Sequence, residues 1–372
     1  DVDGQLYVDL SNQIGVISHE TNPEETDTLI GIENIVASDG SDTVIGDDTA
    51  NTIWGLNGND IINTAAGDDL IVGGRGADQI DGGFGYDTVD YSEDELIGGL
   101  HGVAVDLVDG NARDGFGNLD TLSNIEGVIA SNQSDTVQGD AADNTIDTKG
   151  GDDWIAGGAG HDSIDSGLGH DVIFGGSGDD LITSGIGDDT IYGGDGDDVI
   201  NGGVGSDYIE DGAGDDLIYA GDGDDTVYSS RGTDTIDGGQ GNDTITFTVD
   251  HNDDEAGLSG IALDLQTGEA INSDGVAETI TNFENVNATG GDDTVYGSEG
   301  DNAIYGLKGD DQLYGRGGDD HIGAGLGSNI IDGGSGTDIA DYSSINIDTT
   351  VDLSTGIVSK VDGTSDTLIS IE

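Results

Sequence analysis

An aspartate recurs every nine residues along much of the chain, at the sixth position of a repeat that reads G-G-x-G-x-D-x-U-x, where U is a large aliphatic residue. Over residues 130–246 the pattern holds for thirteen consecutive repeats without an insertion or deletion. Carboxylate oxygens beside the accessible carbonyl oxygens of a glycine-rich backbone form the kind of ligand set that Ca²⁺ prefers. The spacing therefore predicts a regular series of calcium sites rather than a single one.

The candidate metal ligands are the position-six aspartates of three arrays of this repeat, at residues 37–90, 130–246 and 288–341. Asparagine replaces aspartate in four of the 25 repeats, and three of these asparagines fall in the second repeat of their array. A neutral amide fits that position if the first coil caps the array and has few calcium neighbours. We predict that the metal-binding residues are Asp60, Asp69, Asp78, Asp87, Asp153, Asp162, Asp171, Asp180, Asp189, Asp198, Asp207, Asp216, Asp225, Asp234, Asp243, Asp293, Asp311, Asp320 and Asp338.

The number of calcium ions follows from the number of repeats. If each ion lies between the loops of repeats i and i+2, arrays of six, thirteen and six repeats offer at most about 19 sites. Glycine-rich loops that bind phosphate carry a lysine or precede a helix, whereas the neighbours here are aspartates. EF-hand loops end in a glutamate at position twelve and lie between two helices, and the acidic loops of this chain lack both features.

The elements that position the aspartates follow from the other residues of the repeat. Glycine at positions one, two and four suits turns with positive φ, and the last three residues alternate outward, inward and outward as in a short strand. The inward position holds isoleucine or valine in all thirteen repeats of the long array, and β-branched residues favour a pleated surface. With two repeats per turn, stacked turns would bury these residues in one ladder. The predicted fold is all-β, a parallel β-roll stabilised by calcium.

A second pattern, V-D-L followed by D-T-L and I-E, occurs at residues 8–33, 105–126, 263–284 and 351–372, with conservative changes in the third copy. We call each copy a connector. Its hydrophobic pieces predict short strands joined by a polar turn, and each of the first three connectors precedes an array. The predicted modules are residues 1–92, 93–250 and 251–343, each a connector with its β-roll, and residues 344–372, the start of a fourth connector.

The formal net charge is -72 at pH 7, with 79 acidic residues against seven lysines and arginines. This sign excludes nucleic acids and anionic membrane surfaces as partners, and no apolar run approaches the ~20 residues of a membrane span. The first ten residues lack the basic and apolar regions of a signal peptide. Such charge favours disorder unless bound metal neutralises it and drives folding. Since the chain has no cysteine, we expect calcium to take the stabilising role of disulfide bonds.

The nonapeptides, the connectors and the D-Y-S segments at residues 90–92 and 341–343 together resemble the hemolysin-type, or RTX, calcium-binding family. Similar segments occur in C-terminal regions of serralysin-type proteases, in repeat modules of alginate epimerases, and in bacterial RTX adhesins and surface-layer proteins. The resemblance implies a parallel β-roll, export by a type I secretion machine and folding on contact with extracellular calcium. It also implies that the position-six aspartates bind the metal together with carbonyl oxygens of the glycine loops.

The expected function is that of a calcium-binding structural repeat region of a secreted bacterial protein, in an adhesin stalk, a surface layer or a matrix fibre. We expect no enzymatic activity, because the sequence lacks H-E-x-x-H and G-x-S-x-G. One alternative is an accessory region of a secreted protease, lipase or polysaccharide epimerase whose catalytic domain lies outside this chain. Another is a carbohydrate-binding module, because outward tyrosines recur at position nine. The candidate partners are therefore calcium ions, cell-surface polysaccharide and copies of the chain itself, at the cell surface or in the extracellular medium.

Calcium should convert the chain from an expanded, disordered state to compact β structure, because the 79 acidic side chains repel one another until metal neutralises them. Circular dichroism with and without a chelator measures this change. A β spectrum that is unchanged after exhaustive calcium removal would contradict the prediction.

Overall fold

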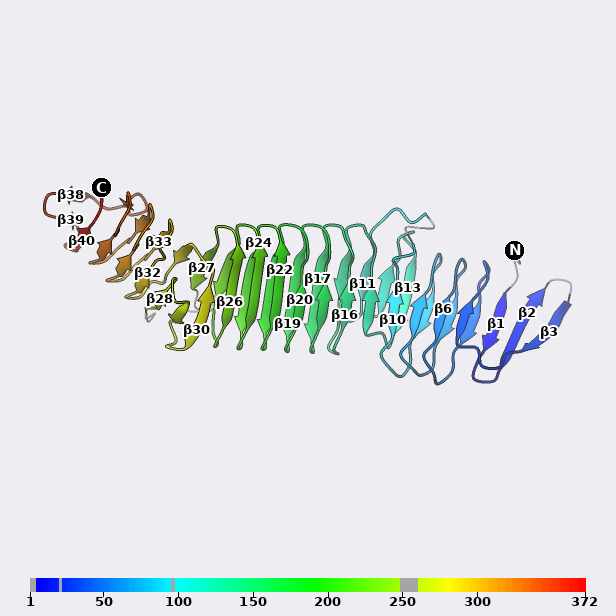
Figure 1. Ribbon diagram of the computed structural model, residues 1–372. Coiled ribbons are helices and arrows are strands. Elements are labelled where there is room, and N and C mark those ends of the chain that lie inside the picture. Colours follow the sequence, from blue (N-terminus) through cyan, green and yellow to red (C-terminus); the bar gives the residue numbers. More distant parts are fainter. Residues whose placement is uncertain (1–4, 20–21, 95–97, 248–259) are drawn as a thin grey trace. The chain divides into compact units, whose positions relative to one another are not determined.

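The computed structural model describes residues 5–19, 22–94, 98–247 and 260–372, and within these ranges every regular element is a β-strand. The all-β prediction is confirmed. The chain forms two compact units, residues 1–186 and 187–372, and Figure 1 draws the strands of both as arrows coloured along the sequence. No helix in the described ranges is long and apolar enough to cross a membrane.

The strands of the first unit are short, and most hold three residues. They are β1 (Leu6–Asp9), β2 (Ile14–His19), β3 (Asn22–Thr28), β4 (Asn34–Val36), β5 (Thr43–Ile45), β6 (Thr52–Trp54), β7 (Ile61–Asn63), β8 (Leu70–Val72), β9 (Gln79–Asp81), β10 (Thr88–Asp90), β11 (Ala104–Asp106), β12 (Asn111–Arg113), β13 (Leu119–Ser123), β14 (Gly127–Ile129), β15 (Thr136–Gln138), β16 (Thr145–Asp147), β17 (Trp154–Ala159), β18 (Ser163–Asp165), β19 (Val172–Ser177) and β20 (Leu181–Thr183).

The second unit begins with longer strands, because several of its loops continue the pairing through the two glycines that follow the strand. Its strands are β21 (Thr190–Asp195), β22 (Val199–Val204), β23 (Tyr208–Ala213), β24 (Leu217–Asp222), β25 (Thr226–Ser229), β26 (Thr235–Gln240), β27 (Thr244–Phe247), β28 (Ala262–Asp264), β29 (Glu269–Ile271), β30 (Ala277–Thr281), β31 (Asn285–Asn287), β32 (Thr294–Tyr296), β33 (Ala303–Tyr305), β34 (Gln312–Tyr314), β35 (His321–Gly323), β36 (Ile330–Asp332), β37 (Ile339–Ala340), β38 (Thr349–Asp352), β39 (Ile357–Lys360) and β40 (Ser365–Ile369).

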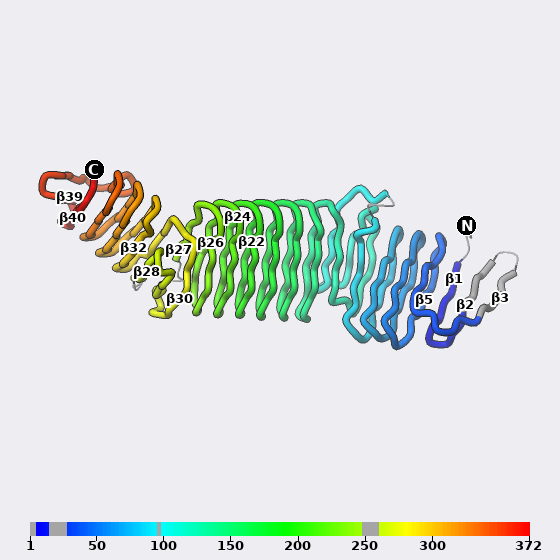
Figure 2. The backbone as a smooth tube through the Cα atoms, in the orientation of Figure 1, coloured from blue at the N-terminus to red at the C-terminus, as the bar shows by residue number. Residues whose placement is uncertain are grey.

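Strands from alternate repeats pair in parallel, so that one turn of the coil contains two repeats. Ile146 of β16 lies opposite Ile164 of β18 in the first unit, and Ile200 of β22 lies opposite Ile218 of β24 in the second. Figure 2 shows the successive turns around β22, β24 and β26 stacked in this way. The predicted parallel β-roll with two repeats per turn is confirmed.

The core of each unit is the ladder of position-eight aliphatic residues. From Ile53 to Ile80 in the first unit and from Ile191 to Ile245 in the second, every such residue is at most 2% exposed. The loops around this ladder pack backbone against backbone. At position four, Gly76 has φ of 155°, and a Cβ atom there would overlap the carbonyl oxygen of Gly58 in the preceding coil. Glycine is therefore required at this position both for its φ and for the close approach of the coils.

Each connector contains one strand more than we predicted. In the second connector β11, β12 and β13 are antiparallel neighbours, and the middle strand, β12, falls in the segment that we interpreted as a polar turn. The outer strands also join the roll, since β13 pairs in parallel with β9 and β11 with β15. This connector is thus built into the stack of coils. The predicted module boundaries stay a prediction, and the one between residues 250 and 251 lies outside the described residues.

Truncation of one ladder residue should cost far more than truncation of its neighbour in the same strand. Ile62 is 1% exposed and Ile61 is 48% exposed, and both belong to β7. In saturating calcium, Ile62→Ala should lower the free energy of unfolding by about 2–5 kcal/mol, because it opens a cavity between coils. Ile61→Ala should cost less than about 1 kcal/mol. Equal losses in the two variants, measured by chemical denaturation, would show that the ladder is not the core.

Candidate metal sites

Each position-six aspartate is fixed by the coil that precedes it. The backbone N–H of Asp60 donates to Oδ1 of Asp78 at 2.8 Å, and that of Asp207 donates to Oδ1 of Asp225 at 2.8 Å, in both cases across eighteen residues. The same bond recurs along the arrays of each unit. All nineteen predicted ligands are buried, with at most 3% of each residue exposed. The fold therefore holds one carboxylate per repeat inside the loop.

The second oxygen of these carboxylates is where the structure fits a cation. Buried polar atoms without a hydrogen-bond partner are costly and rare, yet they recur here at one position of the repeat. A hard divalent cation, together with carbonyl oxygens of the adjacent glycine loops, is the natural partner for such an oxygen. Buried Oδ2 atoms without a hydrogen-bond partner belong to Asp60, Asp69, Asp78, Asp87, Asp153, Asp162, Asp207, Asp216, Asp225, Asp234, Asp243, Asp311, Asp320 and Asp338.

Burial also raises the pKa values of these carboxyl groups. Burial raises the pKa of Asp60 to about 8, and the carboxylates of Asp78 and Asp42 add to the shift. Burial likewise raises the pKa of Asp207 to about 7 and that of Asp311 to about 8, with repulsion from neighbouring aspartates as a further cause. Backbone N–H donors lower each pKa by less. The protein's own donors thus offset only part of the cost of burying these charges, and a bound cation would offset more of it.

The first repeat of each of the two later arrays is satisfied by protein donors instead. Ser131 donates its backbone N–H to Oδ2 of Asp135 at 2.8 Å and its hydroxyl to Oδ1 at 2.8 Å. Thr289 makes the same two bonds to Asp293, at 3.0 and 2.8 Å. Among the predicted ligands, Asp293 therefore differs from those with an unpartnered oxygen, since both of its oxygens already accept hydrogen bonds. The signal for this difference is the serine or threonine at position two.

The second repeat of these arrays is capped by its asparagine. The side-chain oxygen of Asn144 accepts from the backbone N–H of Asp140 at 2.8 Å, and its Nδ2 donates to the carbonyl oxygen of Glu126 in the connector at 3.2 Å. Asn302 makes the equivalent bond to the carbonyl oxygen of Glu284 at 2.9 Å. These contacts agree with the predicted role of the first coil as a cap, because a neutral amide can donate toward the connector where a carboxylate cannot.

Acidic residues of the connectors continue the ladder, and we did not predict this. Oδ1 of Asp120 accepts from the N–H of Asp78 at 2.9 Å, and Oε2 of Glu126 accepts from the N–H of Asp87 at 2.9 Å. The later connectors repeat these bonds with Asp366, Glu284 and Glu372. A signal exists in the sequence, because Asp120-Thr121-Leu122 and Glu126-Gly127-Val128 both have an acid two residues before an aliphatic residue, as in the D-x-U of the nonapeptide. Their six-residue spacing concealed it.

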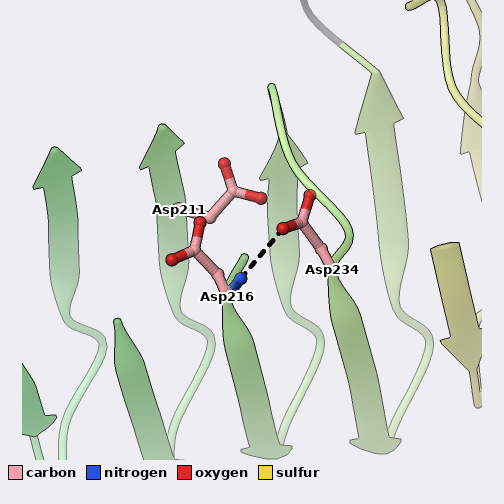
Figure 3. Close-up of side chains that lie close together, drawn as sticks. All are labelled: Asp211, Asp216 and Asp234. Atoms are coloured by element: carbon pink, nitrogen blue, oxygen red, sulfur yellow. Dashed lines mark hydrogen bonds between the residues drawn. The ribbon is translucent and has the colours of Figure 1, made fainter. Parts of the chain in front are cut away.

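One repeat of the second unit carries an additional buried acid. Asp211 stands at position one, where glycine is usual, and carboxylate oxygens of Asp211, Asp216 and Asp234 lie within 4.8 Å of one another (Figure 3). Burial raises the pKa of Asp211 well above its usual range, and the carboxylates of Asp234 and Asp216 add to the shift. A side chain at position one points at the position-six carboxylate of the same repeat, as a Cβ built on Gly193 shows by lying 2.7 Å from Oδ2 of Asp198. This loop thus concentrates more oxygen ligands than its neighbours.

Several of the outward tyrosines lie side by side on the surface of the roll. The rings of Tyr296 and Tyr314 stack with centroids 4.7 Å apart. Tyr208, which is not at position nine, lies between Tyr192 and Tyr228, with centroid separations of 6.0 and 4.9 Å. These faces offer apolar rings with polar edges at the surface.

Comparison with known proteins agrees with this geometry. The family described as RTX calcium-binding nonapeptide repeat (4 copies) matches residues 27–89, 129–245 and 287–340, which is more than half of the chain. Among solved structures, the crystal structure of the extracellular lipase LipA from Serratia marcescens is similar at 18% sequence identity and a TM-score of 0.22. That match covers 66% of this chain and 38% of the lipase, so the chain spans well under half of the lipase's length. No curated protein matches the chain.

Without calcium, the roll should be more stable in acid than in base. Because the folded-state pKa values of Asp60, Asp207 and Asp311 are raised to about 7–8 from an ordinary value of 3.8, folding favours their protonated forms. That stabilisation is complete below the unfolded-state pKa and is lost as the pH rises through about 7–8. Circular dichroism of metal-free protein between about pH 5.5 and 8.5 should show β signal falling with pH.

Saturating calcium is the control, because protons compete with the metal for the same carboxylates and the trend with pH should reverse. Metal-free protein that is equally folded at both ends of the range, or more folded at the higher pH, would show that the buried carboxylates do not control folding.

Proposed function

Because the chain belongs to the family of RTX calcium-binding nonapeptide repeat proteins, we propose that it is a structural region that works outside the bacterial cell and becomes rigid when it binds calcium. The single observation that carries this proposal is the column of buried position-six carboxylates, whose Oδ2 atoms lack a protein partner repeat after repeat. Buried polar atoms in native proteins are nearly always hydrogen-bonded, so a repeated set of oxygens without a protein partner supports binding of a ligand there.

The mechanism is a coupling of ion binding to folding. The bound ion would supply positive charge and oxygen coordination in the loops. The chain contributes the geometry: the preceding coil fixes Oδ1 of each aspartate through a backbone N–H, and this bond holds Oδ2 toward the interior of the loop. The isoleucine ladder then stacks the coils, so that each new coil is built on a finished one.

The distribution of the acids supports a structural role over a catalytic one. Candidate ligands recur at even spacing along both units instead of converging on one cleft, and the interior coils share the same arrangement. Enzymes place a few perturbed groups around one reacting position. We therefore propose an adhesin stalk, a surface layer or a matrix fibre, with the accessory region of a secreted enzyme as the alternative. Sugar binding by the tyrosine faces and self-association stay predictions.

The protein isolated from its source distinguishes these roles. Electron microscopy in calcium should show a lattice or fibre that disperses when the calcium is chelated, since rigidity depends on the bound ions. The intact mass should show no attached catalytic domain. A dispersed particle whose mass includes such a domain would favour the accessory role and overturn the structural one.

A further inference from the structure

One lysine is buried inside the roll with all of its donors used. Nζ of Lys360, at the end of β39, donates to the carbonyl oxygens of Gly325 and Gly327, both at 2.9 Å. Its third partner is Oδ1 of Asp366, also at 2.9 Å, and the side chains of both residues are fully buried. An ammonium group has three N–H donors, so this one is completely satisfied. Burial of a charge is tolerated only with such pairing.

The three partners of Lys360 are the oxygens that a metal ion would take. Gly325 and Gly327 are positions two and four of the repeat at residues 324–332. Asp366 stands in the position-six place of the next coil, because Oδ1 accepts from the N–H of Asn329 at 2.9 Å. Glycine-loop carbonyls and a buried carboxylate are ligands typical of calcium. The ammonium therefore lies where the ladder would otherwise need a cation.

The junction between the first array and the second connector is built in the same way as the junction that contains Lys360. β13 pairs with β9 in the same register as β40 with β36, and Asp78 donates its N–H to Oδ1 of Asp120 at 2.9 Å as Asn329 does to Asp366. A tyrosine of the D-Y-S segment donates to the other oxygen of the connector acid in both copies. The two places are thus built alike from the fifth repeat of a six-repeat array and the connector that follows it.

The two copies carry different charges: the first has four acids, and the second has one acid and one lysine. The place of Lys360 is taken by Asp114 in the earlier connector, and both residues donate their backbone N–H to the carbonyl oxygen four residues later at 3.1 Å. Asn329 and Ile345 stand where the first copy has Asp78 and Asp94. The third array thus keeps a single acid, balanced by the lysine, whereas the acids of the first copy are Asp78, Asp94, Asp114 and Asp120.

The first copy also has the oxygens that a cation would complete. Asp78 and Asp94 are each 1% exposed, and Oδ2 of Asp78 and Oδ1 of Asp94 have no hydrogen-bond partner. The remaining oxygen of Asp94 accepts from the N–H of Gly115 at 2.9 Å, next to Asp114 in the turn of the connector. Asp94 lies within electrostatic reach of Asp78 and Asp114. An external cation would complete these two unpartnered oxygens, at the junction where the other copy has an internal ammonium.

The third connector has a neutral side chain, an asparagine, at the equivalent position. Asn272 corresponds to Asp114 and Lys360, and its Nδ2 donates to the carbonyl oxygen of Gly232, position four of its loop, at 3.3 Å, and also to Glu278. A donor at this connector position therefore reaches the loop carbonyl in two of the three copies. In the remaining copy this position holds Asp114, which has no donor for the loop and accepts hydrogen bonds from Phe116 and Asn118 of its own turn.

We propose that the ammonium of Lys360 permanently replaces a metal ion at the last coil junction of the third array, and that the equivalent junction of the first array, lined by Asp78, Asp94, Asp114 and Asp120, binds a divalent cation of the calcium type. The proposal rests on the proposed calcium function, because it concerns which junctions of the same roll take the ion.

Native mass spectrometry of the full chain tests the proposal by counting bound calcium ions. Asn329→Asp combined with Lys360→Asp rebuilds the third junction with acids, and this double variant should bind one ion more than the unmodified protein. Asp114→Lys places an ammonium in the first junction and should bind one ion fewer. Lys360→Met is the matched control, since it removes the charge, fills the space with a side chain of similar length and should leave the count unchanged.

The β signal of each variant by circular dichroism in saturating calcium checks that the roll is folded. Because the two variants change different junctions, one of them still tests the proposal if the other does not fold. If the double variant gains no ion and Asp114→Lys loses none, while the unmodified chain binds many, the assignment of these two junctions is wrong. If the unmodified chain itself binds only one or two ions, the calcium function of the roll fails instead.

Discussion

The structure depends on one bond, the hydrogen bond from a backbone N–H to Oδ1 of the position-six carboxylate eighteen residues later. This bond connects consecutive coils at the loops, where the isoleucine ladder does not reach. It also fixes a negative charge inside each loop, with its second oxygen turned toward position one of the repeat. Every other feature of the repeat either permits this placement or compensates its charge.

The chain compensates the charge in four chemically different ways. Ser131 and Thr289 donate to the aspartates of first repeats. Asparagine replaces aspartate in second repeats and donates to a carbonyl of the connector. Lys360 supplies an internal ammonium at one junction. At other repeats of the arrays, such as those of Asp60 and Asp207, the unpartnered Oδ2 atom fits a cation. Protein donors thus satisfy the first coil of the two later arrays, and many of the repeats that follow fit a cation.

The sequence predicts the roll well because its period is local. Nine residues determine one loop and one strand, and the position of Ile146 or Ile200 in the core follows from alternation alone. The connectors are harder to predict, since β12 pairs antiparallel with strands that are themselves part of parallel ladders. The role of Asp120 depends on its pairing with Asp78, which lies 42 residues earlier instead of the usual eighteen. No nine-residue period contains that information.

Asp211 shows how closely position one and position six are coupled. A Cβ atom at position one faces Oδ2 of the same repeat, and in Gly55 and Gly202 it would lie 2.5 and 2.7 Å from the oxygens of Asp60 and Asp207. A side chain at position one therefore shares the space of the carboxylate, as it does in the repeats that begin with Thr64, Thr148 and Ser166. An aspartate at this position adds a third buried carboxylate, and carboxylates within 4.8 Å of one another repel strongly. This loop thus holds a group of three carboxylates whose repulsion a single cation would relieve.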